Sequence, residues 1–148
     1  MEKLAGADVH HLAKIVADRY PPFDIAQNLG LLYHVQNPML ALHQVRSCVR
    51  DNGFMLLETA IWRDDNSFPM ARFNSDLGIY NDVTTYWAMN YPCLVAMLKM
   101  TGWEPDEASS SIVGDCNACR ICIICRASKC PEGVDNFGAG LITKSPPA

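Results

Sequence analysis

Five cysteines near the C-terminal end are the densest group of chemically capable side chains in this sequence of 148 residues. Four of them recur at every third position: Cys116, Cys119, Cys122 and Cys125. Cys130-Pro131 follows, so the run is similar to the iron–sulfur pattern C-x2-C-x2-C-x3-C-P. The last spacer, Arg126 to Lys129, has four residues instead of three. A cysteine-rich metal or redox protein is therefore one hypothesis.

The same segment is also a strand candidate. Residues 120–126, Arg-Ile-Cys-Ile-Ile-Cys-Arg, are rich in the β-branched side chains that favour strands. Residues three apart in a strand point to opposite faces, so successive cysteines would not converge on one ion. We therefore predict no metal site, and a closing β-hairpin made of Ser109–Val113 and Cys119–Arg126.

Two apolar runs upstream predict neighbouring strands with a helix between them. Phe23–Leu29 and Phe54–Thr59 are almost continuously apolar, which is typical of parallel strands covered on both faces. Asn37-Pro38 predicts a helix start, because asparagine caps helices and proline suits the first helical position. Asp51-Asn52-Gly53 predicts its end and a turn.

The other predicted elements are weaker. Leu4–Ala7 is a possible strand end, and His11–Tyr20 predicts a helix closed by Pro21-Pro22. Ile61–Asn90 is polar, aromatic and irregular. Asn90 and Pro92 start a helix that ends at Gly102. Strands alternating with helices indicate an α/β fold with a mainly parallel sheet and a C-terminal β-hairpin.

Composition narrows the class of protein. Hydrophobic residues make up 49% and charged residues 19% of the sequence, which excludes a disordered chain. The net charge of −4 argues against a nucleic-acid surface carried by this chain alone. Neither a secretory signal nor a run of ~18 apolar residues is visible, so we predict a cytoplasmic protein without a membrane contact. One domain over residues 1–130 and a flexible tail over 131–148 are expected.

Four short segments carry a resemblance to a known family. Phe23-Asp24, Gly30-Leu-Leu-Tyr-His34, Pro38 and Leu56-Leu-Glu-Thr59 are similar to a branch of the class I S-adenosylmethionine (SAM) dependent methyltransferases. This branch includes the carboxy-SAM-dependent tRNA wobble-uridine carboxymethyltransferases. The resemblance covers Leu4 to Arg126, the C-terminal half of a typical member, and it implies a Rossmann-like sheet lacking its first strands.

The resemblance also implies a cofactor site. Such enzymes hold SAM, or a carboxylated derivative of it, at the carboxyl ends of their parallel strands. Asp8 would accept a hydrogen bond from the adenine amino group, although it equally suits a helix cap. Tyr33 would line the methionine end, with His34 just behind it. The implied cofactor-binding residues are Ala7, Asp8, Leu29, Gly30, Tyr33 and His34.

Four further residues are candidates for contacts with the acceptor substrate. Glu58 ends a predicted strand at its carboxyl end, where it would position a substrate or bind a neighbouring loop. Arg72, Trp87 and Asn90 lie in or beside the irregular segment, in which members of this family vary with their substrates. The expected acceptor is a small molecule or a tRNA.

Two features of the family are missing from the sequence. Members have a glycine-rich turn after the first strand and an acidic residue after the second, and neither is found here. The first hypothesis is thus a SAM-dependent methyltransferase, or its C-terminal half, active once a partner or a missing N-terminal half completes it. An inactive fragment or partner subunit that acts as a binding module is the alternative. An uncovered edge and face also predict a homo-oligomer or a partner chain.

Overall fold

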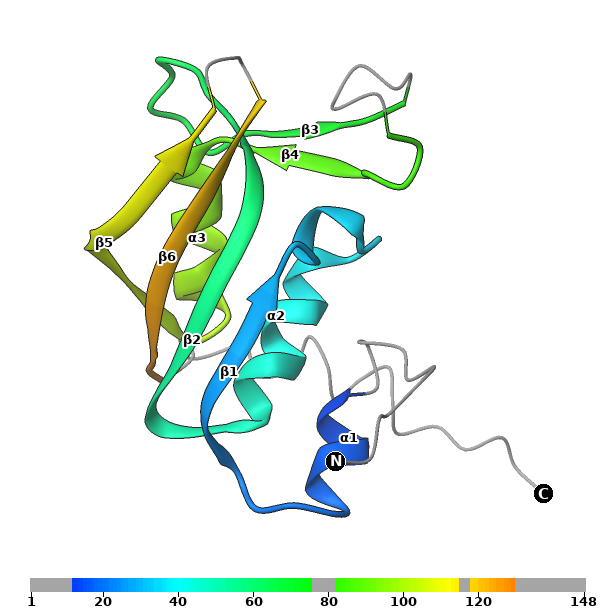
Figure 1. Ribbon diagram of the computed structural model, residues 1–148, viewed down its shortest axis with the longest axis vertical. Helices are drawn as coiled ribbons and strands as arrows, with labels where there is room; N and C mark the ends of the chain where they lie inside the picture. The colour runs from blue at the N-terminus through cyan, green and yellow to red at the C-terminus, as the bar shows by residue number, and fades with distance from the viewer. Residues whose placement is uncertain (1–11, 76–81, 115–117, 130–148) are drawn as a thin grey trace.

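The computed structural model describes residues 12–75, 82–114 and 118–129, which form one sheet with helices packed on it (Figure 1). The strands are β1 (Phe23–Leu29), β2 (Val49–Trp62), β3 (Ala71–Phe73), β4 (Trp87–Met89), β5 (Trp103–Val113) and β6 (Ala118–Ala127). The helices are α1 (Leu12–Ala17), α2 (Pro38–Ser47), α3 (Tyr91–Met100) and the short 3-10 helix η2 (Leu32–His34). The strand order is β3-β4-β2-β6-β5, and β1 pairs with β2.

The sheet is mixed, which corrects the prediction of a mainly parallel one. β1 and β4 both run parallel to β2. Three pairs are antiparallel: β2 with β6, β5 with β6, and β3 with β4. The difference arises because the C-terminal hairpin is long and lies directly against β2. The α/β class and the hairpin itself are confirmed, with longer strands than predicted.

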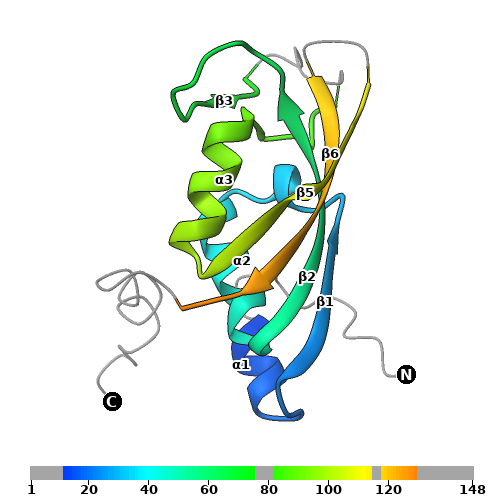
Figure 2. The same cartoon turned by 90° about the vertical axis from the view of Figure 1, so that its left-hand side faces the viewer.

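Local signals in the sequence explain where α2 and α3 begin. Asn37 and Asn90 cap them, since their side-chain oxygens accept hydrogen bonds from Leu40 N and Cys93 N, each at 3.0 Å. A proline lies in the first turn of each helix. Both helices pack on the same face of the sheet (Figure 2). The core between them includes these fully buried side chains: Leu42, Met55, Leu57, Leu94, Leu98 and Trp103.

Residues 51–53 form an irregular part of β2 instead of the predicted turn after a helix. Asn52 has a φ of 61°, and the register between β1 and β2 shifts beside it. A Cβ at Gly53 would lie 2.6 Å from Val49 Cγ1 and 2.7 Å from the Asp24 carbonyl oxygen. The close approach of two backbones therefore requires glycine here.

The structure overturns the prediction that β1 is covered on both faces. Only Asn28 is buried in this strand, and Ile25 and Leu29 are 63% and 51% exposed. Among the described residues, no helix covers the face of the sheet opposite α2 and α3 (Figure 2). The register places these exposed apolar side chains together on that open sheet face: Ile25, Leu29, Phe54, Leu56 and Ile124.

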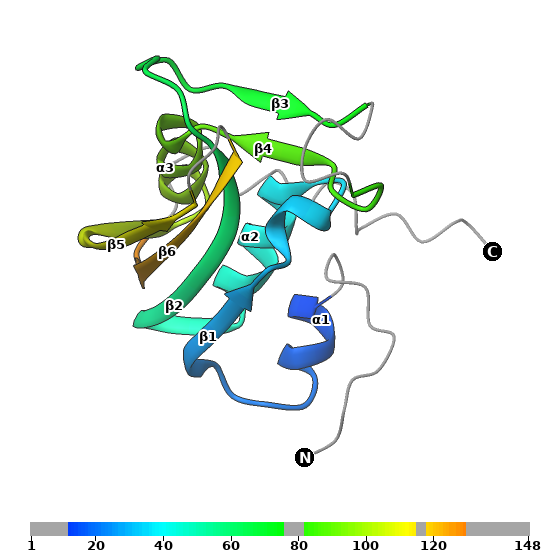
Figure 3. The ribbon, with the colours of Figure 1, turned by 45° about the horizontal axis from the view of Figure 1, so that its top comes forward.

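The predicted strand end at Leu4–Ala7 and the predicted tail from residue 131 lie outside the described residues. Within the described part of the chain, no helix is long and apolar enough to cross a membrane. Both short strands, β3 and β4, lie in the segment that was expected to be irregular. They cross the end of the sheet at which β1 and β2 finish (Figure 3).

Candidate functional site

A tight turn at the carboxyl end of β1 forms the base of the site. Gly30 has a φ of 68°, in the left-handed region that favours glycine, and its N–H donates to the Glu58 carbonyl oxygen at 3.0 Å. A Cβ at this position would lie 3.4 Å from Arg120 Nη2 and 3.6 Å from the Tyr33 hydroxyl. The chain therefore leaves β1 through this turn, and a group of polar side chains lies next to Gly30.

That group is the polar cluster of Tyr33, Glu58 and Arg120. Both carboxylate oxygens of Glu58 accept from the Arg120 guanidinium, from Nε and, at 2.8 Å, from Nη2. Nη2 also donates to the Tyr33 hydroxyl at 2.6 Å, and the guanidinium carbon lies 5.0 Å from the centre of the Tyr33 ring. Three elements, η2, β2 and β6, therefore bring their side chains to one point beside Gly30.

Glu58 and Arg120 keep each other in their charged forms. The Arg120 hydrogen bond holds the pKa of Glu58 below its usual value of 4.5, against the effect of partial burial. The Glu58 hydrogen bond in turn raises the pKa of Arg120. Both side chains are therefore charged at neutral pH, and they form a fixed ion pair at the surface of the sheet.

We expect the Glu58–Arg120 pair to stabilise the fold at neutral pH but not at acidic pH. A carboxyl whose pKa is lowered by folding stabilises the folded state above its unfolded pKa, and this is lost as the pH falls through the folded pKa. Glu58→Gln should thus lower the free energy of unfolding by about 1 kcal/mol at neutral pH, and by less below about pH 4. Urea unfolding at the two pH values measures the difference.

Glu104→Gln is the matched control for this prediction. Glu104 forms an exposed pair with Lys99 at 3.7 Å, so its replacement should change the free energy of unfolding by only a few tenths of a kcal/mol. An equal loss for Glu58→Gln at neutral and acidic pH would contradict the assigned role of the ion pair.

His34 belongs to a second polar group beside the polar cluster. Its ring packs against Tyr33 with centroids 4.1 Å apart, and its Nδ1 lies 2.8 Å from the Thr84 carbonyl oxygen. Thr84 donates from its hydroxyl and its backbone N–H to Asp82, which lowers the pKa of the Asp82 carboxyl. His34 is therefore tied to the loop before β4 and supports Tyr33 from behind.

The cysteine run adopts the strand that its β-branched residues predicted. Cys119 and Cys125 are buried on the helix side of β6, while Cys122 is exposed on the open sheet face. Burial raises the pKa of Cys125 to about 12, so this thiol stays protonated and is a poor metal ligand. The described residues hold no group of three or more His, Cys, Asp or Glu side chains arranged for a metal ion. Cys116 and Cys130 lie outside them.

The sequence is similar to curated proteins of one kind. It is 29% identical over 98 residues to a tRNA U34 carboxymethyltransferase of Syntrophotalea carbinolica, covering 64% of this chain and 29% of the relative. For a protein of the same name from Tolumonas auensis, identity is 26% over 109 residues, covering 70% and 32%. The match thus spans about a third of the length of these relatives. No protein-family model matches the sequence.

Solved structures share the fold. A 1,6-didemethyltoxoflavin-N1-methyltransferase of Burkholderia thailandensis with bound S-adenosylhomocysteine has a TM-score of 0.58 at 17% identity, covering 84% of this chain and 50% of that one. The N-terminal domain of EvdMO1, with S-adenosylhomocysteine, has a TM-score of 0.54 at 20% identity, covering 82% and 53%. The chain resembles the class I SAM-dependent methyltransferases of the tRNA U34 carboxymethyltransferase branch. A cyclase, SpnF, has a TM-score of 0.60, so the methyltransferase fold alone does not determine the reaction.

The structure brings together most of the residues predicted for the cofactor of such a methyltransferase. Leu29, Gly30, Tyr33 and His34 surround the turn after β1, and Glu58 joins them from β2. The prediction that Glu58 ends its strand is wrong, because pairing with β6 continues β2 to Trp62. Leu29 is half exposed, whereas Tyr33 is 6% exposed. The other two predicted cofactor contacts, Ala7 and Asp8, lie outside the described residues.

The predicted acceptor residues other than Glu58 lie further along, around β3 and β4. Arg72 is exposed on β3, and Trp87 on β4 donates from Nε1 to the Gln36 carbonyl oxygen at 3.2 Å. Asn90 is 1% exposed and caps α3, so its described hydrogen bonds stay within the protein.

Sequence reasoning missed Arg120 and Thr84. Arg120 lies opposite Ala60 in the pairing of β2 with β6, one step along the sheet from Glu58. Arg120 lies two residues before Cys122 in the predicted strand, a spacing that puts both side chains on one face. The partner across the sheet follows only from the register, which no local pattern encodes.

Proposed function

We propose that this chain is the C-terminal half of a SAM-dependent methyltransferase that transfers a methyl group to an acceptor. The observation that carries the proposal is the left-handed turn at Gly30 beside the polar cluster, at the carboxyl end of β1 and four residues before the end of the parallel strand β2. Ligands of open α/β sheets bind at this end of the strands. Relatives named tRNA U34 carboxymethyltransferase, and similar folds with bound S-adenosylhomocysteine, support a SAM-dependent transferase.

The polar cluster suits the amino-acid end of SAM. A carboxylate would accept from the Arg120 guanidinium and the Tyr33 hydroxyl, and an ammonium group would donate to Glu58. Gly30 leaves room for close approach, because a Cβ would stand within 3.6 Å of all three side chains. SAM would supply the activated methyl group, and this chain would contribute alignment. The same donors suit a carboxylated SAM derivative.

Half of such a site is absent from this sequence, since it has no glycine-rich turn between a strand and a helix. We therefore infer that activity requires further polypeptide, which would also cover the open sheet face. The alternative function is a binding module without catalysis, which is favoured by the short match to the relatives, 29% and 32% of their lengths. A third hypothesis, a metal or redox protein, has little support, because Cys119 and Cys122 are on opposite faces of β6.

The names of the relatives and of a solved neighbour indicate two kinds of acceptor. The relatives named tRNA U34 carboxymethyltransferase favour a tRNA acceptor and a cytoplasmic protein, whereas the Burkholderia thailandensis structure holds a small molecule. We propose that the acceptor reaches the site from the side of β3 and β4, where Arg72 and Trp87 lie.

We expect S-adenosylhomocysteine to bind the isolated chain weakly and at the polar cluster. In a titration followed by ¹H–¹⁵N NMR, millimolar S-adenosylhomocysteine should shift the amides of Gly30, Tyr33 and His34. Arg120→Gln should reduce these shifts at least several-fold, because the cofactor carboxylate loses a charged donor. The matched control, Arg50→Gln, removes an exposed arginine paired with Asp24 at the other end of β1.

Two outcomes would contradict the proposal. If millimolar S-adenosylhomocysteine does not shift the amide signals of Gly30 to His34 in the folded protein, the proposed cofactor site is wrong. This result would favour the alternative of a binding module without catalysis. If one equivalent binds with low-micromolar affinity, the site is complete and the need for further polypeptide is wrong. Circular dichroism establishes folding in both cases.

A further inference from the structure

The outer edge of β1 carries backbone groups that no described strand pairs with. Among the described strands, β1 pairs only with β2, so its other side is an edge of the sheet (Figure 1). Gly30 N donates to the Glu58 carbonyl oxygen, which shows that the even-numbered residues of this segment direct their backbone groups toward β2. Alternation along the strand turns the backbone groups of the odd-numbered residues outward. These outward N–H and C=O groups are here called the free edge, and they belong to Ile25, Gln27 and Leu29.

The other edge strands of the sheet are protected against pairing, whereas the free edge is not. β5 contains Pro105, which lacks an N–H group, and its pairing is irregular between Asp106 and Ser111. Acidic side chains also lie on it at Glu104, Asp106 and Glu107. β3 is only three residues long. The free edge has no proline, no charged side chain and no break in its register, although soluble proteins usually protect exposed edges. It is therefore suited to pairing with another strand.

The backbone pattern of the free edge is complementary to itself. In an antiparallel pair, residues that exchange two backbone hydrogen bonds recur at every second position. Two copies related by a two-fold axis beside Gln27 would pair Gln27 with Gln27 of the second copy, and Ile25 with Leu29 of the second copy. All outward groups are then satisfied, by about six hydrogen bonds. A shift of the pairing by two residues would leave one residue of each free edge unpaired.

The side chains of the free edge also fit a second copy. Ile25 and Leu29 are 63% and 51% exposed, and the two-fold axis would bring them together as apolar cross-strand pairs. The exposed amide of Gln27 would meet its own counterpart, to which it can donate and from which it can accept. Asp24 is the one charged residue of β1, and it is paired with Arg50. No like charges therefore meet along the edge, although each chain has a net charge of −4.

We propose that two copies of this chain form an antiparallel dimer through the free edge, with Gln27 on the two-fold axis. The pairing joins two six-stranded sheets into one continuous sheet. It leaves the open sheet face uncovered, so association through that face is a separate contact. One edge accepts one strand, and the dimer therefore excludes any other polypeptide that would pair with β1. The dimer does not depend on methyltransferase activity.

Hydrogen exchange of the Ile25, Gln27 and Leu29 amides reports on the free edge alone. These N–H groups exchange with solvent in the monomer and are protected when they donate to a second copy. Between about 50 μM and about 1 mM protein, we expect their exchange to slow about fourfold, because the monomer fraction of a dimer falls as the square root of the concentration. ¹H–¹⁵N NMR measures the rates. The amide of Asn28, which faces β2, is the internal reference and should not respond to concentration.

Opposite charges at position 27 test the register, because this residue would pair with itself. Gln27→Lys and Gln27→Glu each place two like charges directly opposite one another, which disfavours the pair. In either variant alone, exchange of the Ile25 and Leu29 amides should lose its dependence on concentration. In an equal mixture of the two variants, lysine faces glutamate and the protection should return. Only a contact that brings position 27 of both copies together gives this recovery.

Ser111→Lys and Ser111→Glu are the matched controls, because Ser111 is an exposed, uncharged residue of the edge strand β5. Both should keep the concentration dependence of the unchanged chain. Circular dichroism checks that all variants are folded. Exchange that is independent of concentration in the unchanged chain, protection that persists in Gln27→Lys or Gln27→Glu, or a mixture without recovery would overturn the dimer. Loss of association in Leu56→Asp alone would then assign the contact to the open sheet face.

Discussion

Arg46→Met is expected to lower the free energy of unfolding by about 3 kcal/mol. Nε of Arg46 donates to the carbonyl oxygens of Gly102 and Ser128 at 3.1 and 2.9 Å, and Nη1 donates to that of Val49 at 2.7 Å. The guanidinium carbon also lies 5.9 Å from the centre of the Trp103 ring. Methionine keeps the packing of the stem but leaves these carbonyl groups without their donor.

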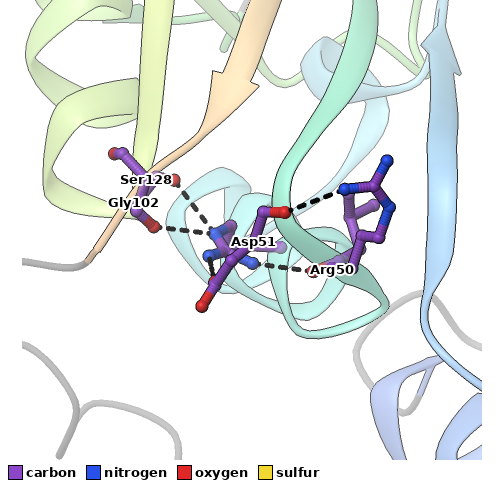
Figure 4. A network of polar contacts seen from close by, with 6 residues as sticks. Arg50, Asp51, Gly102 and Ser128 are labelled. Carbon is purple, nitrogen blue, oxygen red and sulfur yellow. Dashed lines mark hydrogen bonds and ion pairs between the residues drawn. The ribbon is translucent and has the colours of Figure 1, made fainter.

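The position of Arg46 explains why a single side chain matters so much. It connects the end of α2 to the start of β2, the turn before β5 and the residue after β6. Figure 4 shows Asp51, Gly102 and Ser128 around this network. Its side chain is 13% exposed, although its ion-pair partner Asp51 is 79% exposed. The loss should therefore come from the hydrogen bonds to backbone and far less from the ion pair.

Arg50→Met is the matched control in the same part of the chain. Arg50 is 52% exposed and pairs with Asp24, which is 77% exposed, so its replacement should cost less than about 1 kcal/mol. Urea unfolding followed by circular dichroism measures both variants. Similar losses for the two arginines would show that the backbone hydrogen bonds of Arg46 contribute little.

The second large effect concerns association through the open sheet face. We expect the isolated chain to self-associate, because five apolar side chains are 36% to 63% exposed there and, among the described strands, β1 pairs only with β2. Leu56→Asp puts a charge at the centre of this face. Its dissociation constant for self-association should rise at least tenfold, since a buried unpaired charge is costly.

Light scattering over a range of concentrations tests this expectation. Val83→Asp is the control, because Val83 is 74% exposed and lies in the loop before β4, outside the strands of the open sheet face. Its association should match that of the unchanged chain. A compact monomer that unfolds cooperatively would contradict the expectation and would mean that residues outside the described part cover this face.

Much of the fold was predictable because its signals are local. The bounds of β1 agree with the predicted strand, since an apolar run between Pro22 and Gly30 has clear ends. Asn37 and Asn90 marked the starts of α2 and α3, because the cap and the following proline act within one turn of helix. The β-branched run around Cys122 identified β6 for a similar local reason.

Other features depended on contacts between distant residues. The turn expected at Asp51-Asn52-Gly53 became part of β2, because the backbone of β1 lies against it. The apolar character of β1 predicted burial, yet burial depends on which elements pack against a strand. Apolar side chains tend to be buried, but the sequence of a strand does not show which helix or strand buries them.

The candidate site shows the same division. The motif and its resemblance to a methyltransferase branch predicted that Gly30, Tyr33, His34 and Glu58 lie near one another. That Arg120 connects Tyr33 to Glu58, that Arg72 stacks on Trp62 and that Asn90 is buried under a loop became visible only in the folded protein. The physical reason is that strand register and loop placement arise from packing across the whole sheet, whereas turns and caps are set by a few consecutive residues.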